Sequence, residues 1–241
     1  MTSSKADGSE ATPGTPPRLG DCTWTELARA TQRQRIVVLP IGSCEQHGPH
    51  LPFDTDTRIA LALAAGLAAA RADVLVAPAV GVSASGEHQG FIGTLSIGSA
   101  ALEMMLIELV RSADWSDGVV LVNGHGGNLS AVSGAVSVLQ SEGRRVLNWW
   151  PRLTGGDAHA GRTETSLMLA IAPDAVRRAA AQRGATEPIA ELWGELRRGG
   201  VAAVSTNGVL GDPLGATPEE GAAILESLVG DLVERVRVWA G

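Results

Sequence analysis

Four short runs of apolar, mostly β-branched residues punctuate the first 150 residues of the chain. They occupy residues 36–41, 74–80, 119–122 and 146–149. Each run is nearly uninterrupted in its apolar character, which is typical of parallel strands buried on both faces. Ala- and Leu-rich segments of helical periodicity lie between them, at about residues 57–70, 99–113 and 128–142. This alternation predicts an α/β fold, a three-layer αβα domain with a mostly parallel central sheet.

The second half of the chain continues in helices. The segment "TETSLMLAI" predicts a helix that ends before Pro173. The segment "TPEEGAAILESLVGDLVERVRVW" predicts an amphipathic terminal helix, with Thr217 as its cap and Pro218 at its first position. A long glycine-bearing loop, residues 199–215, is expected between the two. With no internal repeat and no linker, residues 23–241 are predicted to form one domain.

Residues 1–22 are rich in Ser, Thr, Gly and Pro and lack the apolar core of a signal peptide, which predicts a disordered tail. Two cysteines, Cys22 and Cys44, cannot build a disulfide framework and belong to no CxxC pair, so a reducing cytoplasm is expected. The net charge of -7 leaves no basic surface for nucleic acid or anionic lipid. The longest apolar run, residues 59–70, falls short of the roughly 20 residues of a membrane span. A soluble protein without nucleic-acid or membrane partners is predicted.

Polar clusters follow each predicted strand. They read "GSCEQHGPH" after the first strand, "GVSASGEHQG" after the second, "NGHGGN" after the third and "TGGDAHAGRTE" after the fourth. All five histidines lie in these segments: His47, His50, His88, His125 and His159. Because ligands in open α/β sheets bind beyond the carboxyl ends of the strands, we expect these clusters to meet in one functional site.

His and carboxylate side chains without thiolate are the ligand set of Zn, Mn or Fe at hydrolytic centres. A single histidine near a strand end is more often a structural hydrogen-bonding group, but five on one edge favour metal binding. Glu45 and His47 are two residues apart, so in an extended segment both project from the same side. Asp54 and Asp56 compete for the next role, since either could bind metal or cap the helix that begins near residue 57.

Two other motifs allow more than one interpretation. The glycines of "NGHGGN" could cradle a phosphate, but the motif lacks both GxGxxG spacing and a P-loop lysine, which favours His125 as a metal ligand. In "HAGRTETS", Glu164 could stabilise a helix N-terminus and His159 could pack beneath it. The number of partners favours function instead, because five ligands suffice for two metals when one carboxylate bridges them. The set is Glu45, His47, Asp56, His125 and Glu164, which leaves His159 free to transfer protons.

Taken together, five blocks in order resemble the creatininase family of metal-dependent amidohydrolases. The blocks are "LPIGSCEQHGPHLPFDTD", "GEHQGFIGTLSIG", "LVNGHGGN", "DAHAGRTETSLML" and "GVLGDPLGAT". The resemblance implies a dinuclear centre of two divalent ions (Zn, Fe or Mn) bridged by Asp56, with Asp54 as a local cap or supporting group. It further implies Glu45 and His125 on one metal, His47 and Glu164 on the other, and His159 as the catalytic acid and base.

One departure bears on the substrate. Creatininases that act on creatinine carry a glutamate in the block that here reads "NGHGGN", where this chain has Gly127. The resemblance therefore assigns the second metal to Glu164. The missing glutamate argues against creatinine as the substrate. Within the family, the chain resembles peptidases that release a modified Val-Tyr-derived C-terminal unit from a small ribosomally made precursor peptide of a redox cofactor. The alternative is an amidohydrolase that acts on a small cyclic amide or formamide, and a noncatalytic metal-dependent binding protein is the third possibility.

The remaining expectations concern supporting residues and assembly. His50 and His88 are predicted to shape the pocket or support the ligands. Cys44 would point away from Glu45 and His47 in an extended segment, so packing is expected of it rather than nucleophilic catalysis. The resemblance also implies a homo-oligomer, commonly a hexamer. The terminal helix with Trp239 could supply a subunit contact or pack on its own domain.

Overall fold

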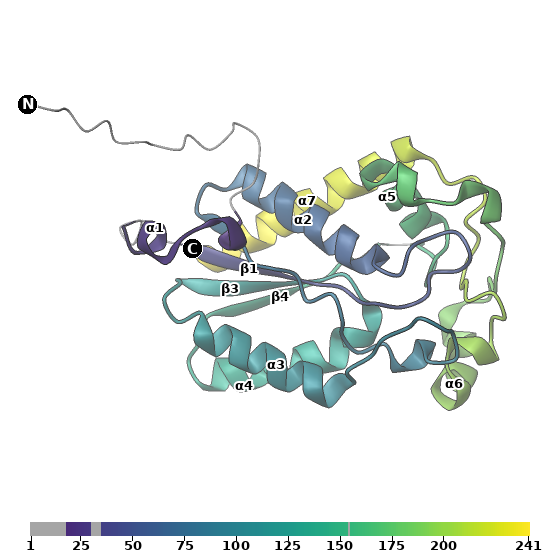
Figure 1. The fold of residues 1–241 in the computed structure, drawn as a ribbon, viewed down its shortest axis with the longest axis horizontal. Helices are drawn as coiled ribbons and strands as arrows, with labels where there is room; N and C mark the ends of the chain where they lie inside the picture. The colour runs from purple at the N-terminus through teal and green to yellow at the C-terminus, as the bar shows by residue number, and fades with distance from the viewer. Residues whose placement is uncertain (1–17, 30–34, 154) are drawn as a thin grey trace, which may run out of the picture.

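A central sheet of four strands organises the molecule (Figure 1). The computed structural model describes residues 18–29, 35–153 and 155–241. The strands are β1 (Ile36–Ile41), β2 (Val74–Val76), β3 (Gly118–Asn123) and β4 (Val146–Trp149). They lie in the order β2-β1-β3-β4, and every pair is parallel. The predicted α/β fold with a parallel sheet is confirmed.

Strand β2 is shorter than the predicted run 74–80. The nitrogen of Ala77 still donates to the Val38 carbonyl at 2.9 Å, but Pro78 follows and has no N–H to donate. The chain leaves the sheet there and returns only for an isolated bridge between Val80 and Ile41. The shortened strand directs the segment after Val80 towards the carboxyl edge of the sheet.

Helices cover both faces of the sheet. The helices are α1 (Trp24–Arg29), α2 (Thr55–Ala70), α3 (Ser99–Ser112), α4 (Leu129–Ser141), α5 (Arg162–Ile171), α6 (Ile189–Gly199) and α7 (Pro218–Ala240). Helices α2, α5 and α7 pack on one face, and α3 and α4 pack on the other (Figure 1). Helix α6 lies apart from both layers, beyond the carboxyl edge of the strands (Figure 1). The sequence interpretation predicted five of these helices and missed α1 and α6.

The strands are apolar on both sides because each side meets a helical layer. Val38 and Val120 join the core beneath α2, α5 and α7, whereas Val37 and Val119 join the core beneath α3 and α4. Successive residues of a strand point to opposite faces, so every position of β1 is buried. Two apolar layers thus hold the sheet rigid, and the polar loops at its carboxyl edge rest on a fixed base.

The terminal helix α7 packs on its own domain. Thr217 caps it as predicted, because its hydroxyl accepts a hydrogen bond from the Glu220 nitrogen at 3.1 Å, and Pro218 occupies the first turn. Leu232 is fully buried against α2 and α5. Trp239 is partly buried against the same core, with the Arg145 guanidinium 5.0 Å from its ring centre. Of the two roles considered for this helix, the structure shows the intramolecular one.

Most of the predicted N-terminal tail, residues 1–17, lies outside the described residues. The remaining part begins with a short 3-10 turn, Leu19–Asp21, which is followed by α1. Among the helices of the described residues, none is both long and apolar enough to cross a membrane.

Candidate metal centre

The loops at the carboxyl edge of the sheet bring all five predicted ligands together. Asp56 lies at the centre of the cluster, with Oδ1 3.1 Å from His47 Nε2 and Oδ2 3.2 Å from His125 Nδ1. Glu45 Oε2 lies 3.1 Å from His125 Nε2, and Glu164 Oε2 lies 3.8 Å from His47 Nε2. Three stretches of the chain that are far apart in the sequence, around residues 45–56, 125 and 164, therefore converge on one point.

Each predicted ligand is positioned by the end of a regular element. Glu45 and His47 follow β1, and His125 directly precedes the turn between β3 and α4. Glu164 lies in the first turn of α5, where its Oε2 also accepts a hydrogen bond from the Ala160 nitrogen at 2.7 Å. Glu164 therefore stabilises the N-terminus of α5 and also approaches His47.

The structure distinguishes the two aspartates. Helix α2 begins at Thr55, two residues earlier than predicted, so Asp56 lies in its first turn and is buried. Ser43 Oγ donates to Asp56 Oδ2 at 2.7 Å and fixes the carboxylate. Asp54 occupies the N-cap position without a side-chain cap hydrogen bond, and instead accepts from Arg58 Nε at 2.8 Å at the surface. Only Asp56 faces the cluster.

The cluster divides into two groups that share Asp56. One comprises Glu45, Asp56 and His125, and the other comprises His47, Asp56 and Glu164. Within each group the candidate ligand atoms all lie within 4.8 Å of one another. Both carboxylate oxygens of Glu45 are buried without a hydrogen-bond donor, and burial raises the pKa of this carboxyl to about 8. A buried carboxylate of this kind is stabilised by a bound cation, so the residues fit a pair of divalent metals.

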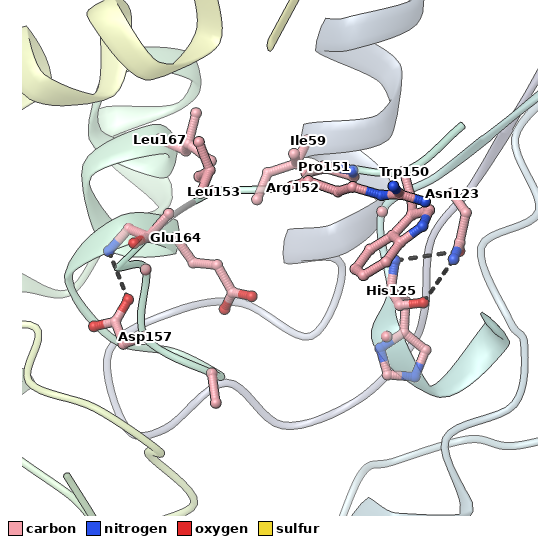
Figure 2. Close-up of a pocket in the computed structure, with 15 residues that line it drawn as sticks. Ile59, Asn123, His125, Trp150, Pro151, Arg152, Leu153, Asp157, Glu164 and Leu167 are labelled. Atoms are coloured by element: carbon pink, nitrogen blue, oxygen red, sulfur yellow. Dashed lines mark hydrogen bonds between the residues drawn. The ribbon is translucent and has the colours of Figure 1, made fainter. Parts of the chain in front are cut away.

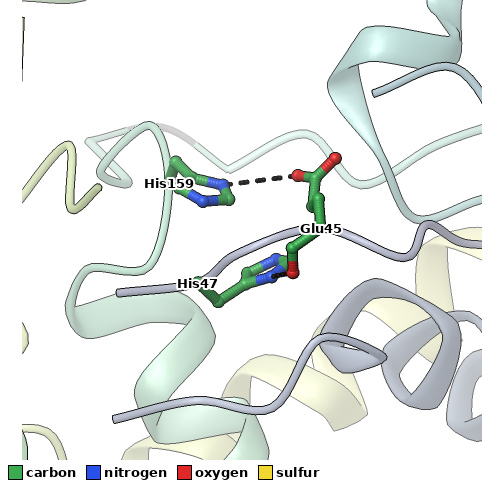
Figure 3. Close-up of side chains that lie close together, drawn as sticks. All are labelled: Glu45, His47 and His159. Carbon is green, nitrogen blue, oxygen red and sulfur yellow. Dashed lines mark hydrogen bonds and ion pairs between the residues drawn. The ribbon is translucent and has the colours of Figure 1, made fainter. Parts of the chain in front are cut away.

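His159 lies beside Glu45 and His47 (Figure 3) and belongs to neither of the two groups that share Asp56. Its Nε2 donates to the Gln46 carbonyl at 2.8 Å, and its Nδ1 faces Glu45 Oε1 at 3.7 Å. Burial, reinforced by His47 and His88, holds the pKa of His159 well below its usual value. The ring is therefore neutral at neutral pH, with Nδ1 free to accept a proton. Together with Glu45 and His47, His159 also forms a further group at ligand distance.

Comparison with known proteins identifies the architecture. The family model described as creatinine amidohydrolase matches residues 20–236. The chain belongs to the creatininase family. Family membership makes it a metal-dependent hydrolase of amide bonds, as the resemblance implied.

Individual members of the family differ in how similar they are to this chain. The chain is 50% identical over 225 residues to the "mycofactocin precursor peptide peptidase" of Mycolicibacterium smegmatis, covering 88% of this chain and 91% of the relative. It is 28% identical to the creatinine amidohydrolase of Pseudomonas putida, covering 91% and 95%. A solved creatininase in its manganese form superposes with a TM-score of 0.77 at 26% identity, covering 91% of this chain and 97% of that one. A mutant creatininase of the zinc–zinc type has the same TM-score and identity.

Two cavities open onto the cluster of candidate ligands, and both are lined by His125 and Glu164. One of about 430 Å³ extends towards the segment after β4, past Trp150 and Leu153 (Figure 2). The other, of about 830 Å³, extends past His159 to α6, where Trp193 forms part of its wall. Helix α6 was missed, although Ile189, Leu192, Trp193 and Leu196 have the spacing of an amphipathic helix.

His50 and His88 lie next to the cluster, and the pKa of each is lowered to about 4, chiefly by burial. His50 Nε2 lies 2.8 Å from Thr165 Oγ1, a contact that ties the loop after β1 to α5. His88 Nδ1 lies 2.9 Å from Gln46 Nε2, and its Nε2 lies 3.3 Å from Glu45 Oε1. The sequence interpretation missed Glu87, the neighbour of His88. Its position beside a histidine in "SGEHQG" was the available signal.

Metal binding at this centre is expected to weaken as the pH falls below about 9, and more steeply below about 8. The carboxyl of Glu45, with its pKa of about 8, is protonated below that pH, whereas a metal ligand must be deprotonated. Burial alone would lower the pKa of His47, but Asp56, Glu164 and Glu45 raise it to about 9, so its ring also releases a proton on binding. Each displaced proton lowers the apparent affinity by about tenfold per pH unit.

Chelator competition with Zn²⁺ at pH values below 8 and above 9 measures this dependence, and calorimetry in buffers of different ionisation enthalpy counts the released protons. A Glu45→Gln variant should release fewer protons than the wild-type protein. Affinity that stays constant with pH would show that the metal-free cluster holds no exchangeable proton.

Proposed function

We propose that the chain is a metal-dependent peptidase that cleaves the mycofactocin precursor peptide and releases its modified, Val-Tyr-derived C-terminal unit for redox-cofactor biosynthesis. The observation that carries this proposal is the 50% identity over 88% of the chain to a relative of that name, against 28% to a creatinine amidohydrolase. The alternative is hydrolysis of a small cyclic amide or formamide, which the similarity to a creatinine amidohydrolase supports.

Two divalent ions, of Zn, Fe or Mn, are assigned to the two groups that share Asp56. Glu45, Asp56 and His125 would hold one ion, and His47, Asp56 and Glu164 would hold the other. When bound, such ions supply an acidified water and polarise the scissile carbonyl. His159 accepts a proton at Nδ1 and delivers it to the departing amide nitrogen, a role suited to a ring that is neutral at neutral pH.

The two cavities suit an extended substrate. They share His125 and Glu164, then diverge towards Trp150 and towards α6. A peptide whose scissile bond lies at the cluster can therefore extend into one cavity on each side of that bond. The larger cavity alone, at about 830 Å³, exceeds the needs of a small cyclic amide.

Purified, metal-loaded protein given the modified precursor peptide and, separately, cyclic amides and formamides tests the proposal. We expect mass spectrometry to detect cleavage of the peptide alone. Turnover of the small amides without peptide cleavage would support the alternative. Peptide binding without hydrolysis by fully loaded protein would support a noncatalytic role. The predicted homo-oligomer and cytoplasmic location stay predictions, and light scattering of the purified protein measures the former.

The Trp193→Ala change is expected to raise KM for the peptide by about tenfold with a smaller effect on kcat. The side chain of Trp193 is 57% exposed and lines the larger cavity, where it offers a flat apolar surface to a substrate side chain. Loss of one such contact costs about 1.4 kcal/mol of binding free energy.

Trp115 supplies the matched control. Its side chain is 50% exposed, and it precedes β3, at the opposite edge of the sheet from the cluster. Trp115→Ala should leave both kinetic constants unchanged. Equal KM values for the Trp193→Ala and wild-type proteins would exclude α6 from substrate binding.

A further inference from the structure

Glu87 reaches the cluster from a loop that none of the predicted ligands occupies. It lies in the 3-10 turn Gly86–His88, between β2 and α3. Its Oε1 lies 3.5 Å from His125 Nε2. With Glu45 and His88, Glu87 forms a group whose candidate ligand atoms lie within 4.8 Å of one another. Glu45 is fully buried, and neither of its oxygens has a hydrogen-bond partner, so an unsatisfied carboxylate faces Glu87.

Gly127 leaves the space that the Glu87 carboxylate occupies. A Cβ atom on residue 127 would overlap Glu87 Oε1 and His125 Nε2, and would lie 2.7 Å from the Ala84 carbonyl oxygen. The φ angle of Gly127 is not positive, so its backbone does not require glycine. The close approach of Glu87 and His125 is therefore the physical reason for a glycine at this position.

The backbone of Glu87 is held from the side of α6. Gly200, at the end of α6, lies so close that a Cβ atom on it would overlap the Glu87 carbonyl oxygen. The next residue, His88, is buried and in contact with Gln46. Among the described residues, the ion pair of Glu87 is with His125, although Arg197 and Arg198 line the same cavity. The turn thus directs Glu87 towards the cluster rather than towards the nearby arginines.

We propose that Glu87 is a further carboxylate ligand of the metal site formed by Glu45, Asp56 and His125, an inference that rests on the proposed dinuclear centre. Charge balance supports it. With Glu87 included, four carboxylates (Glu45, Asp56, Glu87 and Glu164) offset the four positive charges of two divalent ions. A neutral centre is less costly to bury than one that carries a net charge.

The Glu87→Gln variant is expected to lose affinity for one of its two metal ions by about 10- to 100-fold, because the amide is uncharged and a weaker ligand. Metal content after dialysis against a chelator should then fall from two ions to one per chain, and the absorption spectrum of the Co²⁺-loaded protein should change. Glu191→Gln, an exposed carboxylate on α6, is the matched control and should keep both ions.

A shorter carboxylate gives a second test. Glu87→Asp keeps the carboxylate but draws it back by one methylene, and position 127 stays a glycine because a Cβ there would still overlap His125 and the Ala84 carbonyl. Its affinity for the second ion should lie between those of the wild-type protein and Glu87→Gln. Circular dichroism confirms that each variant is folded.

One outcome would overturn the inference: unchanged affinity for both ions in the folded Glu87→Gln protein. Unchanged affinity in Glu87→Gln, with loss of both ions in Asp56→Ala, would remove Glu87 from the site while the dinuclear centre stands. A wild-type protein that binds no pair of ions would instead refute the proposed function.

Discussion

Replacement of Asp56 with alanine is expected to abolish binding of both metal ions and to lower kcat by about 10³-fold or more. Asp56 is the one residue common to the two candidate groups, with one carboxylate oxygen near His47 and the other near His125. Its removal takes a ligand from each site at once. Metal-ion catalysis contributes several kcal/mol to the stabilisation of the transition state, and about 1.4 kcal/mol corresponds to a tenfold change in rate.

The chain supplies its own control for this prediction two residues away. Asp54 is also an aspartate at the start of α2, but it contacts Arg58 at the surface and not the cluster. Asp54→Ala should therefore keep two metal ions and full turnover. Elemental analysis of both variants, purified side by side, checks the difference. An Asp56→Ala protein that retains two ions with wild-type affinity would show that Asp56 does not bridge.

The second large effect is expected from His159→Gln, which should lower kcat by about 10²- to 10⁴-fold while both metal ions stay bound. Glutamine preserves much of the size and polarity of the histidine but cannot carry a proton. In the wild-type protein Nδ1 of His159 faces Glu45, and the Gln46 carbonyl fixes the other nitrogen. The change therefore removes proton transfer while the ligand groups around Asp56 remain intact.

Metal content distinguishes the two roles that the geometry allows His159. Loss of an ion together with activity would identify it as a ligand, in the group that it forms with Glu45 and His47. Cys44→Ser serves as a companion variant, since a cysteine nucleophile beside Glu45 is the rival mechanism. If Cys44→Ser keeps its turnover and His159→Gln loses it, Cys44 is not the nucleophile and His159 acts in proton transfer.

The sequence predicted this fold and most of the candidate ligand cluster because its signals are local and strong. Uninterrupted apolar strands imply a parallel sheet covered on both faces, and parallel strands place their carboxyl ends along one edge. Glu45 and His47 lie two apart in an extended segment, where alternate side chains point the same way, and both face the cluster. For these features, neighbours in the sequence suffice to determine geometry.

The choice between Asp54 and Asp56 needed the start of α2. From the residues alone, either could bind metal or cap the helix, and the family resemblance pointed to Asp56. In a helix, residues two apart point about 200° away from each other around the axis. Once the helix begins at Thr55, Asp56 points inwards and Asp54 lies at the surface. An error of two residues in a predicted boundary is enough to hide this difference.

By itself, then, the sequence determined the α/β architecture, the edge of the sheet that carries the candidate site, and the types of side chain gathered there. Tertiary structure alone decided that Glu87 enters the space left by Gly127 and that α6 walls the larger cavity. Both features depend on contacts between segments about 40 to 110 residues apart, Glu87 with His125 and Gly200 with Glu87. Hydrophobic periodicity reports which face of an element is buried, but it carries no information about which distant loop lies opposite.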